Sequence, residues 1–102
     1  MHVEKWDAKK DGAFSEEALR RKLEKRGYAV SRYVYPPGTY FPDHTHGQDK
    51  IDAVVSGHFR MTTKEGEAIL EAGDCLAVPQ GTVHSAEVVG NQPVVSLDAV
   101  KT

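Results

Sequence analysis

The sequence has little of several features that mark particular protein classes. Only one of its 102 residues is a cysteine, Cys75, so an internal disulfide is excluded and we expect a reducing, cytoplasmic location. Its apolar stretches run for a few residues only, too short to cross a bilayer. The first residues lack the apolar centre of a secretory signal. No repeat and no low-complexity segment is found. We therefore expect a soluble protein without a membrane partner.

An excess of charge of one sign is also missing. Lys and Arg together number 13, Asp and Glu 15, and the formal net charge is −2. This balance does not indicate nucleic acid or an anionic membrane surface as a partner. The length fits one domain with a single modest core. It leaves no room for a fused regulatory domain, so a one-chain regulator is disfavoured.

Polar residues of mixed charge fill residues 1–14, which we interpret as an extended or poorly ordered arm. Trp6 is a lone large apolar side chain there, and we expect it to anchor the arm on its own domain or on a neighbouring copy. A short helix follows over residues 15–27, with its helical turns at about 15–26. Ser15 is a suitable N-cap, and Gly27 suits the left-handed residue that ends a helix.

From residue 28 to residue 102 the pattern changes to short β segments separated by Gly and Pro. Candidate strands occupy residues 28–35, 39–43, 50–56, 58–63, 67–71, 74–78, 83–89 and 93–100. Connections this short cannot hold crossover helices, so the pairing should be antiparallel. Many short strands favour a sandwich or a barrel. The sequence thus predicts an all-β domain with one short N-terminal α-helix.

Two blocks of regularly spaced residues stand out within the β region. The first reads Gly38-x5-His44-x-His46-x3-Lys50-x6-Gly57. The second reads Gly73-x5-Pro79-x-Gly81-x2-His84. On a strand, residues two apart project to the same face, so the first two histidines should point together. The Pro-x-Gly turn of the second block should return the chain so that its histidine reaches the same interior.

These blocks resemble the two sequence motifs of the cupin superfamily. The first block matches Gly-x5-His-x-His-x3-Glu-x6-Gly everywhere except at the glutamate, where this chain has Lys50. The second matches the other motif except at its last residue, where Val88 replaces asparagine. The resemblance implies an antiparallel jelly-roll β-barrel over residues 28–102. It also implies that His44, His46 and His84 bind a divalent transition metal, which the sequence leaves open among Zn, Ni, Fe, Cu and Mn.

Lys50 leaves the fourth ligand unassigned, and three arrangements are possible. The three imidazoles hold the metal alone, with an open position. In the second arrangement an aspartate supplies the missing carboxylate. This is either Asp52, which shares the inward face of Lys50, or Asp49, after a shift of its loop. In the third arrangement no metal is tightly held and Lys50 forms a buried ion pair with Asp52.

Lys50 also has three possible roles of its own. It acts as a catalytic base, since burial and a nearby metal lower the pKa of an amine. It binds the carboxylate of an acidic ligand. In the third role it is structural: its aliphatic stem packs in the barrel wall, and it neither acts as a base nor binds a ligand.

Other residues receive plainer interpretations. His58, after a glycine turn, is expected at the surface, and Cys75 is expected to be a small buried apolar residue. Tyr33, Tyr35, Tyr40 and Phe41 precede the histidines; we interpret them as core or dimer-interface aromatics, with a position at the pocket mouth as the alternative.

Two functions are compatible with this pattern, beside a structural possibility in which the main role of the barrel is pairing with itself or a partner. The first is a metal-dependent enzyme acting on a small organic substrate, of the oxygenase or isomerase type found in similar barrels. The second is a non-catalytic module that binds or senses a small ligand without a tightly held metal. Because small cupins resemble dimer-forming units, we expect a homodimer in either case.

Overall fold

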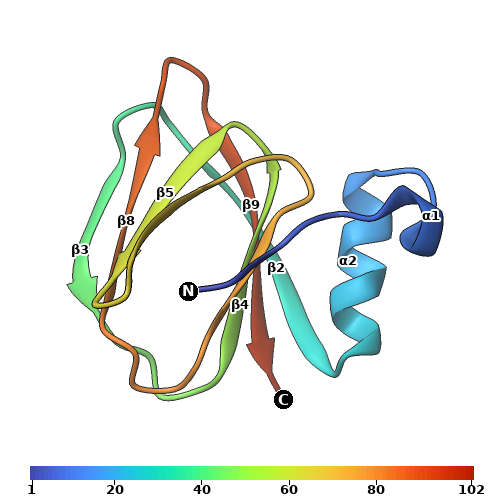
Figure 1. Ribbon diagram of the computed structural model, residues 1–102, viewed down its shortest axis with the longest axis horizontal. Coiled ribbons are helices and arrows are strands. Elements are labelled where there is room, and N and C mark those ends of the chain that lie inside the picture. The colour runs from blue at the N-terminus through green and yellow to red at the C-terminus, as the bar shows by residue number, and fades with distance from the viewer.

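The computed structural model describes residues 1–102 and consists of two antiparallel β-sheets with helices packed outside one of them (Figure 1). The five-stranded sheet has the order β1 (Val3–Glu4), β7 (Cys75–Val78), β4 (Lys50–Ser56), β9 (Val94–Lys101), β2 (Tyr28–Tyr35). The four-stranded sheet has the order β3 (Tyr40–His44), β8 (His84–Val89), β5 (His58–Thr63), β6 (Gly66–Leu70). Every strand pair is antiparallel. The predicted all-β, jelly-roll architecture is confirmed. Its two sheets face each other, and no strand of one sheet is hydrogen-bonded to a strand of the other.

The interior between the two sheets is filled by apolar side chains from both. These buried residues are Val54, Phe59, Met61, Leu70, Leu76, Val78, Ala86, Val88 and Val94. A second cluster lies on the outer face of the five-stranded sheet, under the helix: Leu19, Leu23, Ile51, Ala53, Cys75, Leu97 and Ala99. Alternate residues of β4 and β9 therefore enter different clusters, as the two-residue period of a strand requires. This alternation decides which side chains reach the interior.

The expected helix is present as α2 (Glu16–Lys25). The Ser15 side chain accepts a 3.0 Å hydrogen bond from the backbone N–H of Ala18, as an N-cap does. Leu19 and Leu23, one turn apart, are fully buried against the five-stranded sheet. The helix therefore covers the outer face of the barrel, opposite the interior.

The N-terminal arm is more regular than the expectation of an extended or disordered segment. It forms strand β1, which pairs with β7, and a one-turn helix α1 (Ala8–Asp11) whose N-cap is Asp7. The sequence expectation of a single helix missed α1 because four residues are too few to show helical periodicity. Neither helix has the length and apolar character that a bilayer-spanning helix needs.

Trp6 anchors the arm on its own domain, which was one of the two predicted possibilities. Its indole Nε1–H donates a 2.9 Å hydrogen bond to the carbonyl of Gly12, and its ring packs on the cluster beneath α2. Gly73 makes this approach possible, since a Cβ at that position would lie 2.7 Å from the Trp6 Cβ. The Lys22 ammonium lies 5.0 Å from the ring centroid, at cation–π distance.

Candidate metal centre

Strand pairing sets two of the three motif histidines side by side. His44 is the last residue of β3 and lies opposite His84, the first residue of β8. Their ring centroids are 4.2 Å apart. The register of β3 shifts between Phe41 and His44, where Pro42 has no N–H to pair. Because β3 is an edge strand, the missing donor is tolerated.

Both of these imidazoles are oriented by a hydrogen bond to the backbone two residues earlier. Nδ1 of His44 lies 2.7 Å from the carbonyl oxygen of Pro42, and Nδ1 of His84 lies 2.9 Å from that of Thr82. A carbonyl only accepts, so each Nδ1 carries the proton and each Nε2 keeps a free lone pair. This is the arrangement that fixes the tautomer of a metal-binding histidine.

His46 reaches the same place from a loop. Sequence reasoning put both histidines of the first block on one strand, but β3 ends at His44 and His46 follows in the loop before β4. The backbone of this loop is tied to the second block, because the N–H of Gly81 donates a 3.0 Å hydrogen bond to the His46 carbonyl. The His46 ring centroid lies 4.9 Å from that of His44 and 5.1 Å from that of His84.

The three side chains together form a group that offers one nitrogen each to a single metal ion. One nitrogen from each of His44, His46 and His84 lies within 4.8 Å of the other two. Burial lowers the pKa of His46 and of His84 below the ordinary value, and the Lys50 ammonium acts in the same direction. These two imidazoles are therefore held in the neutral form, which is the form that binds a cation.

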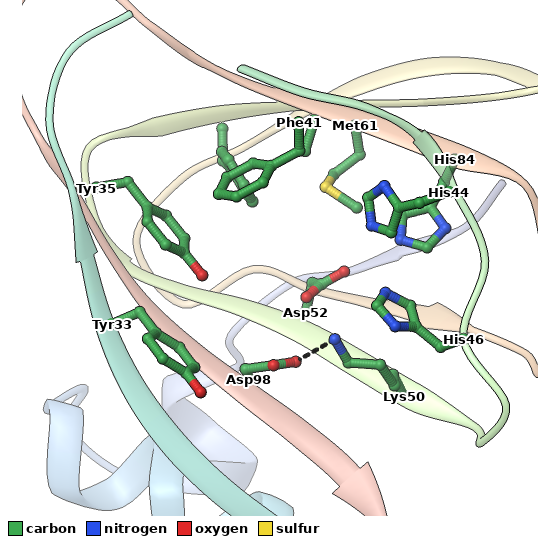
Figure 2. A pocket seen from close by; sticks show the side chains of 12 residues that line it. Tyr33, Tyr35, Phe41, His44, His46, Lys50, Asp52, Met61, His84 and Asp98 are labelled. Atoms are coloured by element: carbon green, nitrogen blue, oxygen red, sulfur yellow. Dashed lines mark ion pairs between the residues drawn. The ribbon is translucent and has the colours of Figure 1, made fainter. Parts of the chain in front are cut away.

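The histidines lie on one side of a pocket of about 180 Å³ inside the barrel, with Tyr33 and Tyr35 on the opposite side (Figure 2). Its lining combines apolar and polar side chains: Tyr33, Tyr35, Phe41, His44, His46, Lys50, Asp52, Phe59, Met61, His84, Ala86 and Asp98. A pocket that is largely apolar with a few polar groups has the usual composition of a small-molecule site.

Lys50 points into this pocket, and its partner is a residue that sequence reasoning did not select. The Lys50 ammonium lies 2.6 Å from Oδ1 of Asp98, on the neighbouring strand β9 (Figure 2). The predicted ion pair between Lys50 and Asp52 is therefore wrong. The strand pairing explains why Asp98 is the partner of Lys50: β4 and β9 run side by side, and both side chains face the same interior. Oδ1 has no hydrogen-bond partner in addition to this close charge contact.

Asp52 lines the pocket as predicted from its alternation with Lys50, but it stands apart from the histidine group. Only 9% of its surface is exposed. Burial raises the pKa of the Asp52 carboxyl to about 6, and the carboxylate of Asp98 acts in the same direction. Asp49 does not reach the pocket, since Oδ1 of its side chain accepts a 2.8 Å hydrogen bond from the backbone N–H of Gln80.

Three of the four aromatic residues before the histidines line the pocket, which was the alternative interpretation. The rings of Tyr33 and Tyr35 are nearly parallel at 6.0 Å, and Phe41 meets Tyr35 edge to face at 5.0 Å. Burial raises the pKa of Tyr35 to about 12, so its hydroxyl stays protonated. Tyr40 points outward and is 58% exposed.

Several pocket residues were missed by sequence reasoning, and Asp98 is the most informative of them. It is the one charged side chain within the apolar stretch Val94–Val100, at an inward-facing position two residues from the buried Ser96. That isolated charge was the available signal. His58 is exposed and Cys75 is buried, as expected; burial raises the pKa of the Cys75 thiol to about 11, so it is a poor nucleophile.

Comparison with known proteins identifies the family from which this site comes. The family model for the cupin domain matches residues 31–100, which include all three histidines and both blocks. The chain belongs to the cupin family. This cupin is 38% identical over 78 residues to germin-like protein 9-3 from Oryza sativa, a match that covers 71% of the chain and 36% of that protein. It is 35% identical over 65 residues to a gentisate 1,2-dioxygenase from a Ralstonia species, a match that covers 63% of this chain and 18% of that protein.

Solved structures agree on the fold. The crystal structure of the DMSP lyase DddQ from Ruegeria pomeroyi superposes with a TM-score of 0.67 at 22% identity, over 74% of this chain and 39% of that one. At this identity the likeness concerns the fold alone. The chain also spans well under half the length of the curated relatives it matches. Related cupins thus include a dioxygenase and a lyase, on partial matches.

Proposed function

We propose that this cupin binds a divalent transition metal through His44, His46 and His84 and acts on a small organic molecule held in the adjoining pocket. The observation that carries the proposal is the pair of Nδ1–H bonds to backbone carbonyls. They leave an Nε2 lone pair on each of two neighbouring rings, and the third ring is close enough to complete the set. Zinc, nickel, iron, copper and manganese all remain candidates, since imidazole suits several of them.

The donor set fits such an ion. Three neutral imidazoles with no carboxylate among them leave coordination positions for water or a ligand. A bound divalent metal would supply a Lewis acid that polarises an oxygen of the ligand. The chain itself supplies the surrounding pocket: the aromatic wall of Tyr35, Phe41 and Phe59 excludes water and favours a ligand with a flat or apolar body.

A catalytic role, of the oxygenase or isomerase type, is the preferred form of the proposal. The name of the related gentisate 1,2-dioxygenase supports it. A non-catalytic ligand-binding or sensing role without a tightly held metal is the alternative. Two further assignments stay predictions: Lys50 as a catalytic group, and Asp52 as a fourth ligand. Both side chains face the pocket, but Lys50 is held in an ion pair.

Metal analysis of the untagged protein tests the proposal. We expect about one equivalent of a transition metal in the wild type after reconstitution and dialysis, and a loss of most of it in His44→Ala. His58→Ala is the matched control, because this histidine lies outside the pocket on the surface and should leave the metal content unchanged. A wild type that retains no metal, or a His44→Ala variant that retains as much as the wild type, contradicts the proposal.

We also propose that the protein forms a homodimer through strand β2, which lies at one edge of the five-stranded sheet. Its residues Tyr33 and Val34 are 45% and 52% exposed, and an edge strand offers unpaired backbone groups. Sedimentation velocity at micromolar concentration measures the mass. Val34→Lys, which puts a charge on this edge, should shift the protein towards monomer, and a wild type that is monomeric contradicts the assignment.

A further inference from the structure

We propose that Asp98 is the positioning residue that makes the site of this cupin usable despite Lys50. It holds the Lys50 ammonium against β9 and neutralises its charge, so that the three histidines can take up a divalent cation. This inference rests on the proposed metal site and goes beyond it by assigning a residue outside both sequence blocks. It also explains how a lysine is accommodated where the family motif has a glutamate.

Lys50 and Asp98 form a close ion pair inside the pocket. Lys50 Nζ and Asp98 Oδ1 are 2.6 Å apart, and their side chains are 11% and 22% exposed. Both project from adjacent strands into the pocket that the histidines line. Attraction between charges at this distance is strong when water is largely excluded. The ammonium is thereby committed to Asp98 and is not a free cation in the pocket.

Asp98 also balances the charge of the pocket. The imidazoles contribute no negative charge, and Asp52 stands apart from the histidine group. Without Asp98, a divalent ion at the histidines would therefore face the unpaired Lys50 ammonium in the same small pocket. Like charges in a low-dielectric space repel strongly. With Asp98 ionised beside it, the pair with Lys50 has no net charge. A divalent cation at the histidines then lies near a pair without net charge, so the electrostatic repulsion between the cation and Lys50 is smaller.

Asp98 has no interaction that competes with Lys50 for its Oδ1 atom. Its Oδ1 atom is buried and has no partner except Lys50. Asp52, the other carboxyl in the pocket, makes no ion pair with Lys50. Asp98 is therefore the residue whose removal would release the ammonium.

A double-mutant cycle read out by Zn²⁺ affinity tests the inference. Competition with a chromophoric chelator gives the dissociation constant for the wild type, Asp98→Asn, Lys50→Met and the double variant. We expect Asp98→Asn to weaken Zn²⁺ binding at least tenfold. Lys50→Met should bind as tightly as the wild type or more tightly, and the double variant should return to within about threefold of Lys50→Met. The affinity is measured on folded protein only, so a role in folding alone would leave the Zn²⁺ affinity of Asp98→Asn equal to that of the wild type.

A second ion pair provides the control. Lys22 and Asp11 lie 2.7 Å apart with side chains 14% and 12% exposed, far from the pocket lining. Asp11→Asn should change stability without changing Zn²⁺ affinity. If Asp98→Asn does not fold, Asp98→Ser is measured in its place: a folded variant that binds Zn²⁺ at least tenfold more weakly than the wild type supports the inference, and one that binds equally well overturns it.

The outcomes separate the two proposals. A wild type that binds no Zn²⁺ overturns the proposed metal function and this inference with it. A wild type that binds Zn²⁺ while Asp98→Asn binds equally well overturns this inference only. A double variant as weak as Asp98→Asn also overturns it, because Asp98 would then act on the metal without involving Lys50.

Discussion

The backbone N–H of Gly81 donates a 3.0 Å hydrogen bond to the carbonyl of His46, and this bond joins the two sequence blocks at the site. His46 lies in a loop, so its position depends on what the loop is attached to. Gly81 has φ of +80°, a conformation that favours glycine. The Pro-x-Gly turn therefore both returns the chain to His84 and supports the loop that carries His46.

Replacing Gly81 by valine should displace this loop. We expect Gly81→Val to destabilise the fold by about 1–2 kcal/mol, the usual cost of a left-handed conformation for a side chain with a Cβ, and to lower the metal affinity. Gly90→Val is the matched control: Gly90 also has φ of +80°, and a Cβ at either position meets no atom within 4 Å. Metal content and thermal unfolding measure both effects. Equal metal retention in the two variants would count against the role of Gly81.

Changing Lys50 to glutamate should restore the donor set of the family motif. The new carboxylate would lie near Asp98 and Asp52, so the metal-free variant is expected to be less stable than the wild type because like charges repel. With metal bound, the effect of the substitution on stability reverses, because the new carboxylate is a further negative ligand for the cation. Thermal unfolding with and without Zn²⁺ checks this; a variant whose unfolding temperature rises no more on adding Zn²⁺ than that of the wild type contradicts it.

The buried carboxyl of Asp52 should make the stability of the metal-free protein depend on pH. Its pKa is raised from 3.8 to about 6 in the folded state, so the unfolded chain releases the proton first as the pH rises. Stability is then lost between about pH 4 and pH 6. Asp52→Asn removes this loss, with a gain of at most about 3 kcal/mol above pH 6.5 and none below pH 4.

Urea unfolding in the presence of a chelator, at a series of pH values, measures this difference. The comparison between wild type and variant isolates Asp52 from the other titrating groups. A constant difference across the range would show that the carboxyl is not the cause.

Trp6→Ala should loosen the arm after strand β1, which stays paired with β7, without affecting the site. The indole loses its packing under α2, its edge-to-face contact with Phe14 at 5.3 Å and its hydrogen bond to Gly12. Because Trp6 is only partly buried, we expect about 2 kcal/mol of destabilisation, below the value for a core tryptophan. Urea unfolding measures it. Metal affinity should stay unchanged, since Trp6 packs in the cluster on the far side of the five-stranded sheet from the histidines, and a large loss of metal would contradict this separation.

The strands and the main helix could be predicted because their signals in the sequence are local. The Gly and Pro breaks located the strands within a few residues, and Ser15 with Leu19 and Leu23 located α2, because caps and periodicity act over a few positions. The spacing of the two blocks indicated the three histidines. By contrast, the one-turn helix α1 has no periodic signal, and its formation depends on the Asp7 cap and on the packing of Trp6.

The remaining features depend on contacts between distant parts of the chain. The partner of Lys50 is Asp98 and not Asp52, because strand register places β9 beside β4. Tyr33 and Tyr35 line the pocket only because β2 lies next to β9. No pattern within a single segment contains this information.

The sequence by itself determined the fold class and the identity of the three histidines, since strand alternation, turn residues and motif spacing are properties of short segments. Tertiary structure alone decided how the chain accommodates a lysine at the glutamate position. That answer lies in Asp98, which the pairing of two strands brings to 2.6 Å from Lys50. An ion pair depends on distance in space, and distance in space is set by the register of the sheet.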